Sequence, residues 1–567
     1  MKNYSRAIRF GVISDSPTLF TWQELVLKKL ISQADIKLGL VLFGSNSRAI
    51  VDSSSTANAT APKSGFLWNI FYNYRIRKMS KALQETDAIW LFEEIPQFFG
   101  DFIIDENGFT ELGTSTIAKL ENAELDFIIN FSANRLIGKV IDVAKYGIWC
   151  YQFGDPEKYP GNSSCFWEIY NKDLVTRGCL LRLTNEPENV IVLKDGYLKT
   201  NILFARNVDK IHLESTFWPL HICQDIKNDN TKFLTALSKI GPNKVASTPS
   251  NLELIKFFFV QLELFFKKAK KSFFYTDYWN LGLANAPIEE FLNGEKLPGI
   301  KWIPNLPKYR FRADPFGVCF KDGLYIIYED FRFDQGMGKI ASFRFNEGSF
   351  VENEIVIDEE FHMSYPFLLE HEDEIYCIPE TYQANQVRLY KALEFPLKWK
   401  LEKVLIENYA GIDSTVFKFE DTWYLFSTNK NSGPHYNLNI HYSDSIFGPW
   451  QEHPKNPVKT DIRSARPAGT MFVHNGALYR PSMDYSEKVE GRISLNRIVK
   501  LTTNEFSEQV HTMINPFENT IYADKVHTLS QMGSYTLVDG AKELFVFSNF
   551  KALKYKFFRL LQKIRNV

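Results

Sequence analysis

A segment in the second half of the chain recurs five times, at intervals of about 50 residues. Each copy has a polar start, an apolar strand, a turn and a second strand rich in aromatic residues, which is typical of a β-hairpin. The copies occupy residues 313–329, 364–380, 412–428, 465–481 and 526–539. Such a period leaves room for four short strands, the content of one propeller blade. The sequence therefore predicts a five-bladed β-propeller over residues 300–549, with an irregular β-sandwich as the alternative.

The first polar position of each copy carries side chains that are unusual for a purely structural repeat. In a propeller, the innermost strand of each blade starts beside the central channel. The residues aligned at this position are Asp314, Tyr365, Asp413, Arg466 and His527. Burying charged groups together is unfavourable unless they pair or face a wet cavity. We therefore expect a ligand site at the channel, and the alternative is a ring of salt bridges that closes it.

Carboxylates at such a channel suit chemistry at a glycosidic bond, where one acts as an acid and another as a base or nucleophile. The predicted catalytic residues are Asp314, Glu380 and Asp413, whose pKa values basic neighbours would tune. A wider set is predicted to bind the substrate: Arg312, Glu329, Tyr365, Arg466, Asp484 and His527. Among these, Arg466 is expected to hold an anionic group such as a phosphate by paired hydrogen bonds.

Several longer strings lie around these positions, including RADPFGV, HMSYPFLLE, YCIPET, GIDSTVF, GPWQEHPKNPV and ARPAGT. Over roughly residues 309–540 they resemble the N-terminal domain of plant glucosamine inositolphosphorylceramide transferases and its bacterial relatives. The resemblance implies a propeller-like domain that accompanies a transferase module, and it leaves the activity of the domain itself open.

The Ala-Asp-Pro string that opens the first copy is also similar, more distantly, to the propellers of family-43 glycoside hydrolases. That family uses an Asp of blade one as base, an Asp of blade two as modulator and a Glu of blade three as acid. Asp314 matches the first of these positions, Tyr365 stands at the second, and no clear Glu matches the third. The hydrolase triad therefore does not carry over, and an enzymatic activity of the propeller remains an open prediction.

The first half of the chain alternates apolar strands with helical patterns. A buried strand is predicted at residues 8–14, a helix at 20–32, and further strands at 37–43, 125–130 and 146–151. This alternation predicts a parallel, Rossmann-type α/β sheet. Neither a GxGxxG string nor a P-loop follows the first strand, so no motif supports nucleotide binding.

The span from DFIINFSANRLIG to GCLLRL resembles the formyltransferase-like fold of methionyl-tRNA and sugar-nucleotide formyltransferases. In that family an Asn, and a His two residues later, polarise the formyl donor and shuttle protons. The matching positions here are Cys150 and Gln152, followed by Asp155 in the next loop. Glutamine cannot act as a general base near pH 7 because its amide does not titrate there. We therefore predict the fold with a vestigial site, and a sugar-nucleotide N-formyltransferase is the alternative.

Charge and cysteine content exclude several classes of protein. The net charge of −1 gives the whole chain no bulk attraction for nucleic acid. The six cysteines are scattered without CxxC spacing, which argues against a zinc site and a disulfide scaffold. No metal or cofactor is predicted. The sequence shows neither a signal peptide nor a long apolar span, so we expect a cytoplasmic protein, peripheral at most on the inner face of the plasma membrane.

Three segments combine aromatic or aliphatic residues with lysine and arginine: 66–83, 254–271 and 550–565. The last is predicted to form an amphipathic helix with one apolar and one cationic face. Its basic residues are Lys551, Lys554, Lys556, Arg559, Lys563 and Arg565. Such helices bind anionic membrane surfaces, and the same contact is expected of residues 254–271. The alternative is a docking helix that packs its apolar face on the propeller.

The predicted fold class is thus multidomain, with an N-terminal α/β formyltransferase-like domain and a C-terminal all-β propeller. The predicted bounds are 1–240 for the α/β domain, 241–299 for a helical connector, 300–549 for the propeller and 550–567 for the tail helix. The leading functional hypothesis is a carbohydrate-active protein of cell-surface glycan or glycolipid synthesis that binds or processes a sugar or glycolipid substrate. The alternative is a non-catalytic glycan-binding scaffold for a partner glycosyltransferase.

Overall fold

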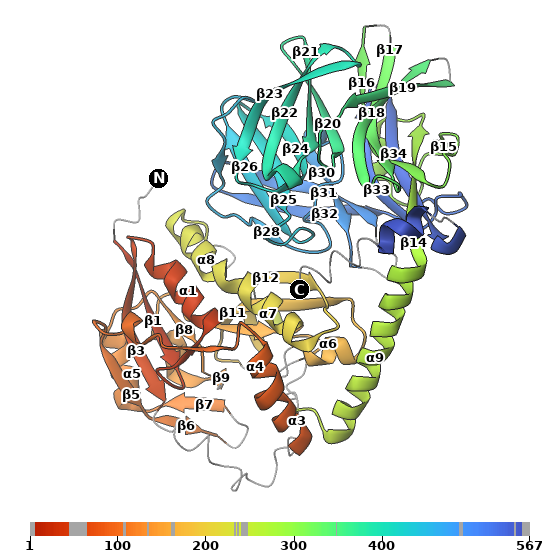
Figure 1. Ribbon diagram of the computed structural model, residues 1–567. Helices are drawn as coiled ribbons and strands as arrows, with labels where there is room; N and C mark the ends of the chain where they lie inside the picture. The colour runs from red at the N-terminus through yellow and green to blue at the C-terminus, as the bar shows by residue number, and fades with distance from the viewer. Residues whose placement is uncertain are drawn as a thin grey trace. The chain divides into compact units, whose positions relative to one another are not determined.

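The chain packs as two compact units, Met1–Phe265 and Phe266–Val567 (Figure 1). The computed structural model describes residues 6–44, 65–105, 109–132, 135–159, 165–186, 188–231, 234, 237–239, 248–321, 323–346, 349–486, 491–548 and 551–557. Among these residues, no helix is both long enough and apolar enough to cross a membrane.

The N-terminal unit is built on one mixed sheet in the order β13-β12-β11-β10-β8-β1-β3-β5. Its parallel strands are β1 (Ile8–Ser14), β3 (Ile36–Gly44), β5 (Gln97–Gly100), β8 (Phe127–Asn130) and β10 (Ile148–Phe153). Its antiparallel edge is β11 (Val175–Leu183), β12 (Asn189–Lys199) and β13 (Leu237–Lys239). The predicted parallel α/β sheet is thus present, with an antiparallel extension at one edge.

Helices cover both faces of this sheet. On one face Trp22 of α1 (Thr21–Ile31) packs against His212 of α7 (Phe204–Glu214), with α8 (Trp218–Lys227) following. On the other face Ile117 and Leu120 of α5 (Thr114–Asn122) join a core that includes Ile128 of β8. The buried, largely apolar pattern of β1 and β8 agrees with strands that are covered on both sides.

Described residues of the C-terminal unit form five antiparallel sheets, an arrangement consistent with a propeller (Figure 1). The first sheet is β16 (Arg310–Phe320), β17 (Gly323–Arg332), β18 (Met337–Asn346) and β19 (Ser349–Ile357). The second is β20 (Ser364–His371), β21 (Glu374–Glu380), β22 (Gln386–Glu394) and β23 (Lys398–Glu407). The third is β24 (Gly411–Phe419), β25 (Thr422–Asn429), β26 (Asn437–Ser443) and β27 (Gln451–Glu452), with β28 (Lys459–Thr460) beside β26. The fourth is β29 (Phe472–His474), β30 (Ala477–Asp484), β31 (Arg492–Leu501) and β32 (Phe506–Ile514).

The fifth sheet joins strands from the two ends of the unit. Its order is β15 (Ile300–Trp302), β14 (Tyr275–Ala284), β34 (Tyr535–Phe545) and β33 (Lys525–Met532). The pairing of β14 with β34 extends from Tyr275 opposite Phe545 to Ala284 opposite Thr536. Because these strands lie far apart in sequence, their ladder ties the start of the unit to its end.

The predicted helical connector at 241–299 is only partly helical. A helix is present there, α9 at Asn251–Phe274, but residues 275–284 form a sheet strand. The sheets therefore begin well before residue 300. The repeat could not reveal β14, because this strand completes a sheet whose hairpin lies at the other end of the chain.

The start of the tail packs on the C-terminal unit. Residues 551–557 are helical, and Ala552 is completely buried in a cluster with Phe331, Phe333 and Val546. Lys551 pairs with Asp334 at 3.1 Å, and Lys556 donates to the carbonyl oxygens of Ser272 and Tyr275. These contacts are those of the docking alternative. Arg559, Lys563 and Arg565 lie outside the described residues.

Candidate functional site

A repeated β-bulge sets the direction of the side chains at the start of the repeat hairpins. In four sheets two residues of the first strand lie opposite one residue of its partner, between Ala313 and Phe316, Ser364 and Phe367, Ile412 and Thr415, and Val526 and Leu529. Asp314, Tyr365 and Asp413 have φ values of 52°, 44° and 50° at these bulges. Aspartate tolerates this left-handed region, whereas it is strained for a bulky tyrosine. The bulges thus re-aim the predicted residues out of the regular strand pattern.

The structure brings the five aligned residues together. The amide of Tyr365 donates to Oδ2 of Asp314 at 3.2 Å, and Nδ1 of His527 lies 2.8 Å from Oδ1 of Asp314. Nε2 of His527 is 3.6 Å from Oδ2 of Asp413, whose carboxylate binds the guanidinium of Arg466 through Nε and Nη2. All five positions therefore belong to one buried polar network.

Tyr365 is the hub of this network. Its hydroxyl lies 2.9 Å from Oγ1 of Thr415 and accepts the N–H of Gly469 at 2.6 Å. Gly469 has a φ of 127°, and a Cβ there would lie 1.8 Å from the carbonyl oxygen of Leu529. Only glycine allows this approach. The tyrosine that replaces a carboxylate in the second copy thus has a structural function, because it joins three sheets.

Asp539 is a member of the network that the sequence pattern did not reveal. Its Oδ1 accepts the amides of His527 and Thr528 at 2.9 and 2.7 Å, and its Oδ2 accepts the amide of Asp314 at 3.0 Å. It therefore satisfies three backbone donors that two bulges leave without ladder partners. Asp539 lies opposite a bulge rather than at the aligned position, so the only available signal was the acidic residue that ends the fifth copy.

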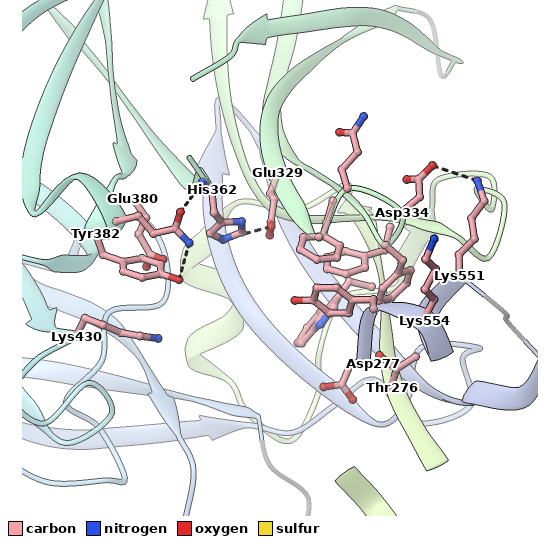
Figure 2. Close-up of a pocket in the computed structure, with 18 residues that line it drawn as sticks. Thr276, Asp277, Glu329, Asp334, His362, Glu380, Tyr382, Lys430, Lys551 and Lys554 are labelled. Atoms are coloured by element: carbon pink, nitrogen blue, oxygen red, sulfur yellow. Dashed lines mark hydrogen bonds and ion pairs between the residues drawn. The ribbon is translucent and has the colours of Figure 1, made fainter. Parts of the chain in front are cut away.

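A cavity of about 1030 Å³ opens beside this network (Figure 2). Figure 2 shows Glu380, His362 and Tyr382 on one side of it, with Lys551 and Lys554 opposite. The aromatic residues of its lining are Trp279, Phe311, Phe331, Phe333, Tyr382 and Tyr555. Its ionisable residues are Asp277, Glu329, Asp334, His362, Glu380, Lys430, Lys551 and Lys554.

Glu380 connects the cavity to the buried network. One of its oxygens, Oε2, accepts the amide N–H of Asp413 at 3.3 Å, and the side chain also lines the cavity. Of the three predicted catalytic residues, only Glu380 is among the lining residues. Asp314 and Asp413 are buried, with 6% and 1% of their surface exposed, and both carboxylates face basic partners. Asp314 and Asp413 are therefore arranged as the alternative prediction describes, in a ring of salt bridges whose members pair with one another.

Glu329 is the second carboxyl group at the cavity. His362 accepts the amide N–H of Gly338 at Nδ1, which leaves Nε2 as the protonated nitrogen of the neutral ring, 3.8 Å from Oε1 of Glu329. A Cβ on Gly338 would lie 2.3 Å from the same oxygen. The glycine thus makes room for the carboxyl group of Glu329.

Burial and neighbouring carboxylates raise the pKa values of the two cavity glutamates, and Glu380 therefore keeps its proton near neutral pH. Burial, followed by the charge of Asp413, raises the pKa of Glu380 to about 8, although Arg466 opposes the shift. Burial, with Asp314 and Glu380 nearby, raises the pKa of Glu329 well above its ordinary value. A protonated carboxyl group can donate a hydrogen bond or a proton to a ligand.

Deeper in the network, ion pairing favours the charged forms of Asp314 and His527. Burial would raise the pKa of Asp314, but His527 and Arg466 more than offset it and hold that pKa below its ordinary value. Burial alone would lower the pKa of His527, whereas the adjacent Asp314 raises it to about 9. Burial raises the pKa of Asp539 to about 6, against the attraction of His527. At neutral pH the core of the network therefore consists of ion pairs, and Glu380, where the network meets the cavity, is protonated.

Two predicted substrate-binding residues, Arg312 and Asp484, lie away from the lining of the cavity. Arg312 is buried, donates to the carbonyl oxygen of Pro304 and stacks on the ring of Phe343. Asp484 is buried and pairs with Arg492. Neither is among the residues that line the cavity. Both positions looked like site residues because they flank the repeat, but their side chains contact parts of their own or neighbouring strands.

Among the residues that the structure describes, Asp314, His527 and Asp539 form a group that could hold a metal ion. Each offers one ligand atom, and these atoms lie within 4.8 Å of one another. A histidine can bind a metal only through a deprotonated nitrogen, yet the carboxylate of Asp314 stabilises the protonated ring. A cation here would have to displace that proton, so the donor set fits a metal poorly at neutral pH.

In the N-terminal unit, Cys150 and Gln152 of the predicted vestigial site lie on β10, and Asp155 lies in the loop that follows it. Cys150 is opposite Leu181, and Gln152 is opposite Cys179. Asp155 lies 3.4 Å from Arg177, and burial raises the pKa of Cys150 to about 11. The thiol is therefore neutral at pH 7, and neither it nor the amide of Gln152 supplies a base.

Comparison with known proteins finds relatives of the C-terminal unit by sequence. Residues 305–529 match the family described as glucosamine inositolphosphorylceramide transferase 1, N-terminal. Glucosamine inositolphosphorylceramide transferase 1 of Oryza sativa subsp. indica is 38% identical over 205 residues, which is 35% of this chain and 27% of the relative. The Arabidopsis thaliana protein of the same name is 37% identical over 209 residues, with the same coverage.

This match confirms the resemblance seen in the motifs. Residues 305–529 are homologous to the N-terminal region of those transferases. The chain spans about a quarter of the length of the curated relatives it matches.

Solved structures with a similar backbone include glycoside hydrolases. Zg3597, a family-117 enzyme of Zobellia galactanivorans, is 12% identical and covers 48% of this chain and 91% of its own, with a TM-score of 0.31. The GH43_1 enzyme of Xanthomonas citri is 13% identical and covers 43% and 89%, with a TM-score of 0.32. Neither likeness bears on the chemistry of the cavity.

Proposed function

We propose that the C-terminal unit is a five-bladed β-propeller whose cavity binds the sugar head group of a glycolipid precursor in cell-surface glycan or glycolipid synthesis. One observation carries the proposal, the cavity of about 1030 Å³ that combines aromatic walls, two glutamates with raised pKa values and three lysines. The homology of residues 305–529 to proteins named for glucosamine and inositolphosphorylceramide supports the same class of ligand.

The lining suits a sugar that carries a phosphate. Aromatic rings pack against the apolar faces of sugar rings, and hydroxyl groups need both donors and acceptors. Both glutamates supply acceptors, and Glu380, whose pKa of about 8 keeps it protonated near pH 7, also supplies a donor. Lys430, which lies over the ring of Tyr382 at 4.7 Å, and Lys554 add positive charge for a phosphodiester.

Glu380 is the residue best suited to chemistry on such a ligand. It lines the cavity, and its raised pKa keeps a proton available for a departing sugar oxygen. Its neighbours Asp413 and Arg466 would set this pKa without touching the ligand. In this account Asp314 and Asp413 are positioning residues, not the acid and base first predicted.

The second candidate is sugar binding without catalysis, in support of a partner glycosyltransferase. The observation that favours it is that Asp413 and Asp314 are buried in ion pairs, which leaves no ionised carboxylate of the predicted catalytic set at the cavity. Turnover distinguishes the two candidates, because both require the sugar to bind.

Two matched lysines test the binding site. Lys430 and Lys418 are both exposed and both lie over an aromatic ring, but only Lys430 lines the cavity. Calorimetric titration of the full chain with inositol 1-phosphate and with glucosamine should detect binding that Lys430→Ala weakens about tenfold, the cost of one charged hydrogen bond. Lys418→Ala should leave it unchanged. An equal effect of the two variants, or no binding to the wild type, would contradict the proposal.

For the N-terminal unit we propose a formyltransferase-like fold that no longer transfers formyl groups. The proposal is supported by the neutral Cys150 and the amide of Gln152 at the positions where the family has its Asn and His. Titration with a folate formyl donor should show no binding. Tight binding of the donor would instead favour the alternative of an N-formyltransferase.

A further inference from the structure

Helix α9 exposes an apolar stripe along most of its length. Leu254, Phe257 and Val260 face inward and are buried. On the opposite side the exposed side chains include Ile255, Phe258, Phe259, Leu262, Phe265 and Phe266. These recur at helical spacing, so they form one continuous face. Phe259 alone has 68% of its surface exposed. Contiguous exposed apolar surface of this kind is the usual mark of a binding surface.

A second exposed apolar segment lies against α9. It comprises α3 (Phe66–Ile70), η1 (Phe71–Ile76) and α4 (Arg77–Met79). Phe71 contacts Phe258, with ring centroids 5.2 Å apart, and the amide of Leu67 donates to the side chain of Asn251. The exposed apolar side chains of this segment are Phe66, Leu67, Ile70, Tyr74 and Met79.

The two segments enclose an apolar groove of about 330 Å³. Its lining residues are Leu67, Ile70, Phe71, Tyr74, Arg75, Leu254, Ile255 and Phe258. The exposed faces of α3–η1 and α9 therefore form one surface, here called the two-helix surface.

Basic residues flank the two-helix surface. On α9 they are Lys256, Lys267, Lys268, Lys270 and Lys271, and beside the groove they are Arg75 and Lys78, all of them exposed. Lys271 is paired with Glu543 at 2.7 Å. The acidic residues of α9 have local partners, since Glu263 pairs with Lys172 and Glu253 accepts from Ser250. Basic residues thus outnumber acidic ones beside the apolar stripe.

We propose that the two-helix surface binds the interface of a bilayer that contains anionic lipids. Apolar side chains flanked by lysine are the composition of helices that lie in such an interface. A second copy of the chain would place like charges against each other, whereas phosphate and carboxylate head groups complement them. The lining of its groove shares no residue with the lining of the sugar cavity. The sequence placed membrane contact at residues 254–271 as well as at the tail, and the proposal keeps the first of these two segments.

Vesicle sedimentation of the full chain tests this proposal. We expect the protein to pellet with vesicles of phosphatidylcholine and phosphatidylserine, but not with phosphatidylcholine alone, and to be released at 0.5 M salt. Phe259→Ser with Leu262→Ser should weaken binding at least tenfold, and Lys267→Gln with Lys270→Gln by roughly fivefold for each charge. Phe99→Ser with Ile103→Ser is the matched control, because Phe99 is 65% exposed in the same unit and remote from α9 in sequence.

Hydrogen exchange on the unaltered chain keeps the test independent of folding defects. Anionic vesicles should slow exchange in residues 251–274 and 66–79. The proposal is overturned if the wild type stays in the supernatant, if the α9 variants pellet as well as the control, or if α9 becomes protected by self-association without lipid. Calorimetry with inositol 1-phosphate should be unaffected by the Phe259 and Leu262 changes, so the sugar site and the membrane surface are tested separately.

Discussion

Nδ1 of His527 lies 2.8 Å from Oδ1 of Asp314, although 213 positions separate the two residues in sequence. Asp314 stands on β16 of the first sheet and His527 on β33 of the last. The pair thus joins the sheet of the first repeat copy to the sheet of the last copy. It also fixes the charge state of the network next to the proposed sugar cavity.

Breaking this pair is expected to cost stability. His527→Asn leaves the buried carboxylate of Asp314 without its cationic partner, and such a loss typically costs about 3–5 kcal/mol. Denaturant unfolding of the C-terminal unit measures the change. His511→Asn, at an exposed position of the fourth sheet, loses only an edge-to-face contact with Tyr479 and should cost at most about 1.5 kcal/mol. Similar values for the two variants would contradict the assignment of the pair.

The stability of the C-terminal unit should fall as pH rises from about 5 to 9. Glu380 and His527 have folded-state pKa values near 8 and 9, above their unfolded values of about 4.3 and 6.5. The folded state therefore binds more protons than the unfolded state, and its advantage is lost as each group deprotonates. Denaturant midpoints across this range measure the slope. Glu380→Gln should flatten the part between about pH 4 and 8, and an unchanged slope would contradict the raised pKa of this residue.

If the cavity is catalytic, Glu380→Gln should reduce turnover by about 10²–10⁴-fold, the usual contribution of a general acid. The affinity for the sugar head group should change little, because the amide keeps the shape and one donor. Turnover of the wild type should decline above about pH 8, where Glu380 loses its proton. Transfer or release of a radiolabelled sugar measures the rate. Glu370→Gln, on the exposed part of β20, is the control, and full activity of Glu380→Gln would leave only the binding function.

A buried salt bridge and an exposed one offer a direct contrast. Arg480 binds both oxygens of Glu508 at 2.6 and 2.9 Å, and each side chain is 1% exposed. Arg480→Met should therefore cost about 3–5 kcal/mol, because Glu508 stays buried with only Lys459 as a partner. Lys398 and Glu394 are paired at 2.8 Å but are about two-thirds exposed, so Lys398→Met should cost less than about 1 kcal/mol. Chemical denaturation of both variants measures the difference.

The repeat allowed the main features of the C-terminal unit to be predicted. Its aligned positions located the hairpins and identified Asp314, Asp413 and His527 as residues that meet, because a repeated hairpin places equivalent residues in equivalent surroundings. Glu329 and Glu380 followed from the same alignment, and both line the cavity.

The partner of each charge could not be predicted in this way. Whether Asp413 faces a ligand or Arg466 depends on the bulge at Ile412/Thr415 and on the neighbouring sheet, neither of which a single repeat encodes. Asp539 was missed for the same reason, since it caps backbone donors of two sheets. β14 lies outside the repeat altogether and is paired only through the long-range closure with β34.

The location of a bound sugar tests the central claim most directly. A crystal of the full chain soaked with inositol 1-phosphate and glucosamine should show difference density in the cavity between Tyr382 and Glu380, with the phosphate within reach of Lys430 or Lys554. Density at another place on the chain, or a cavity that stays empty at saturating ligand, would contradict the account.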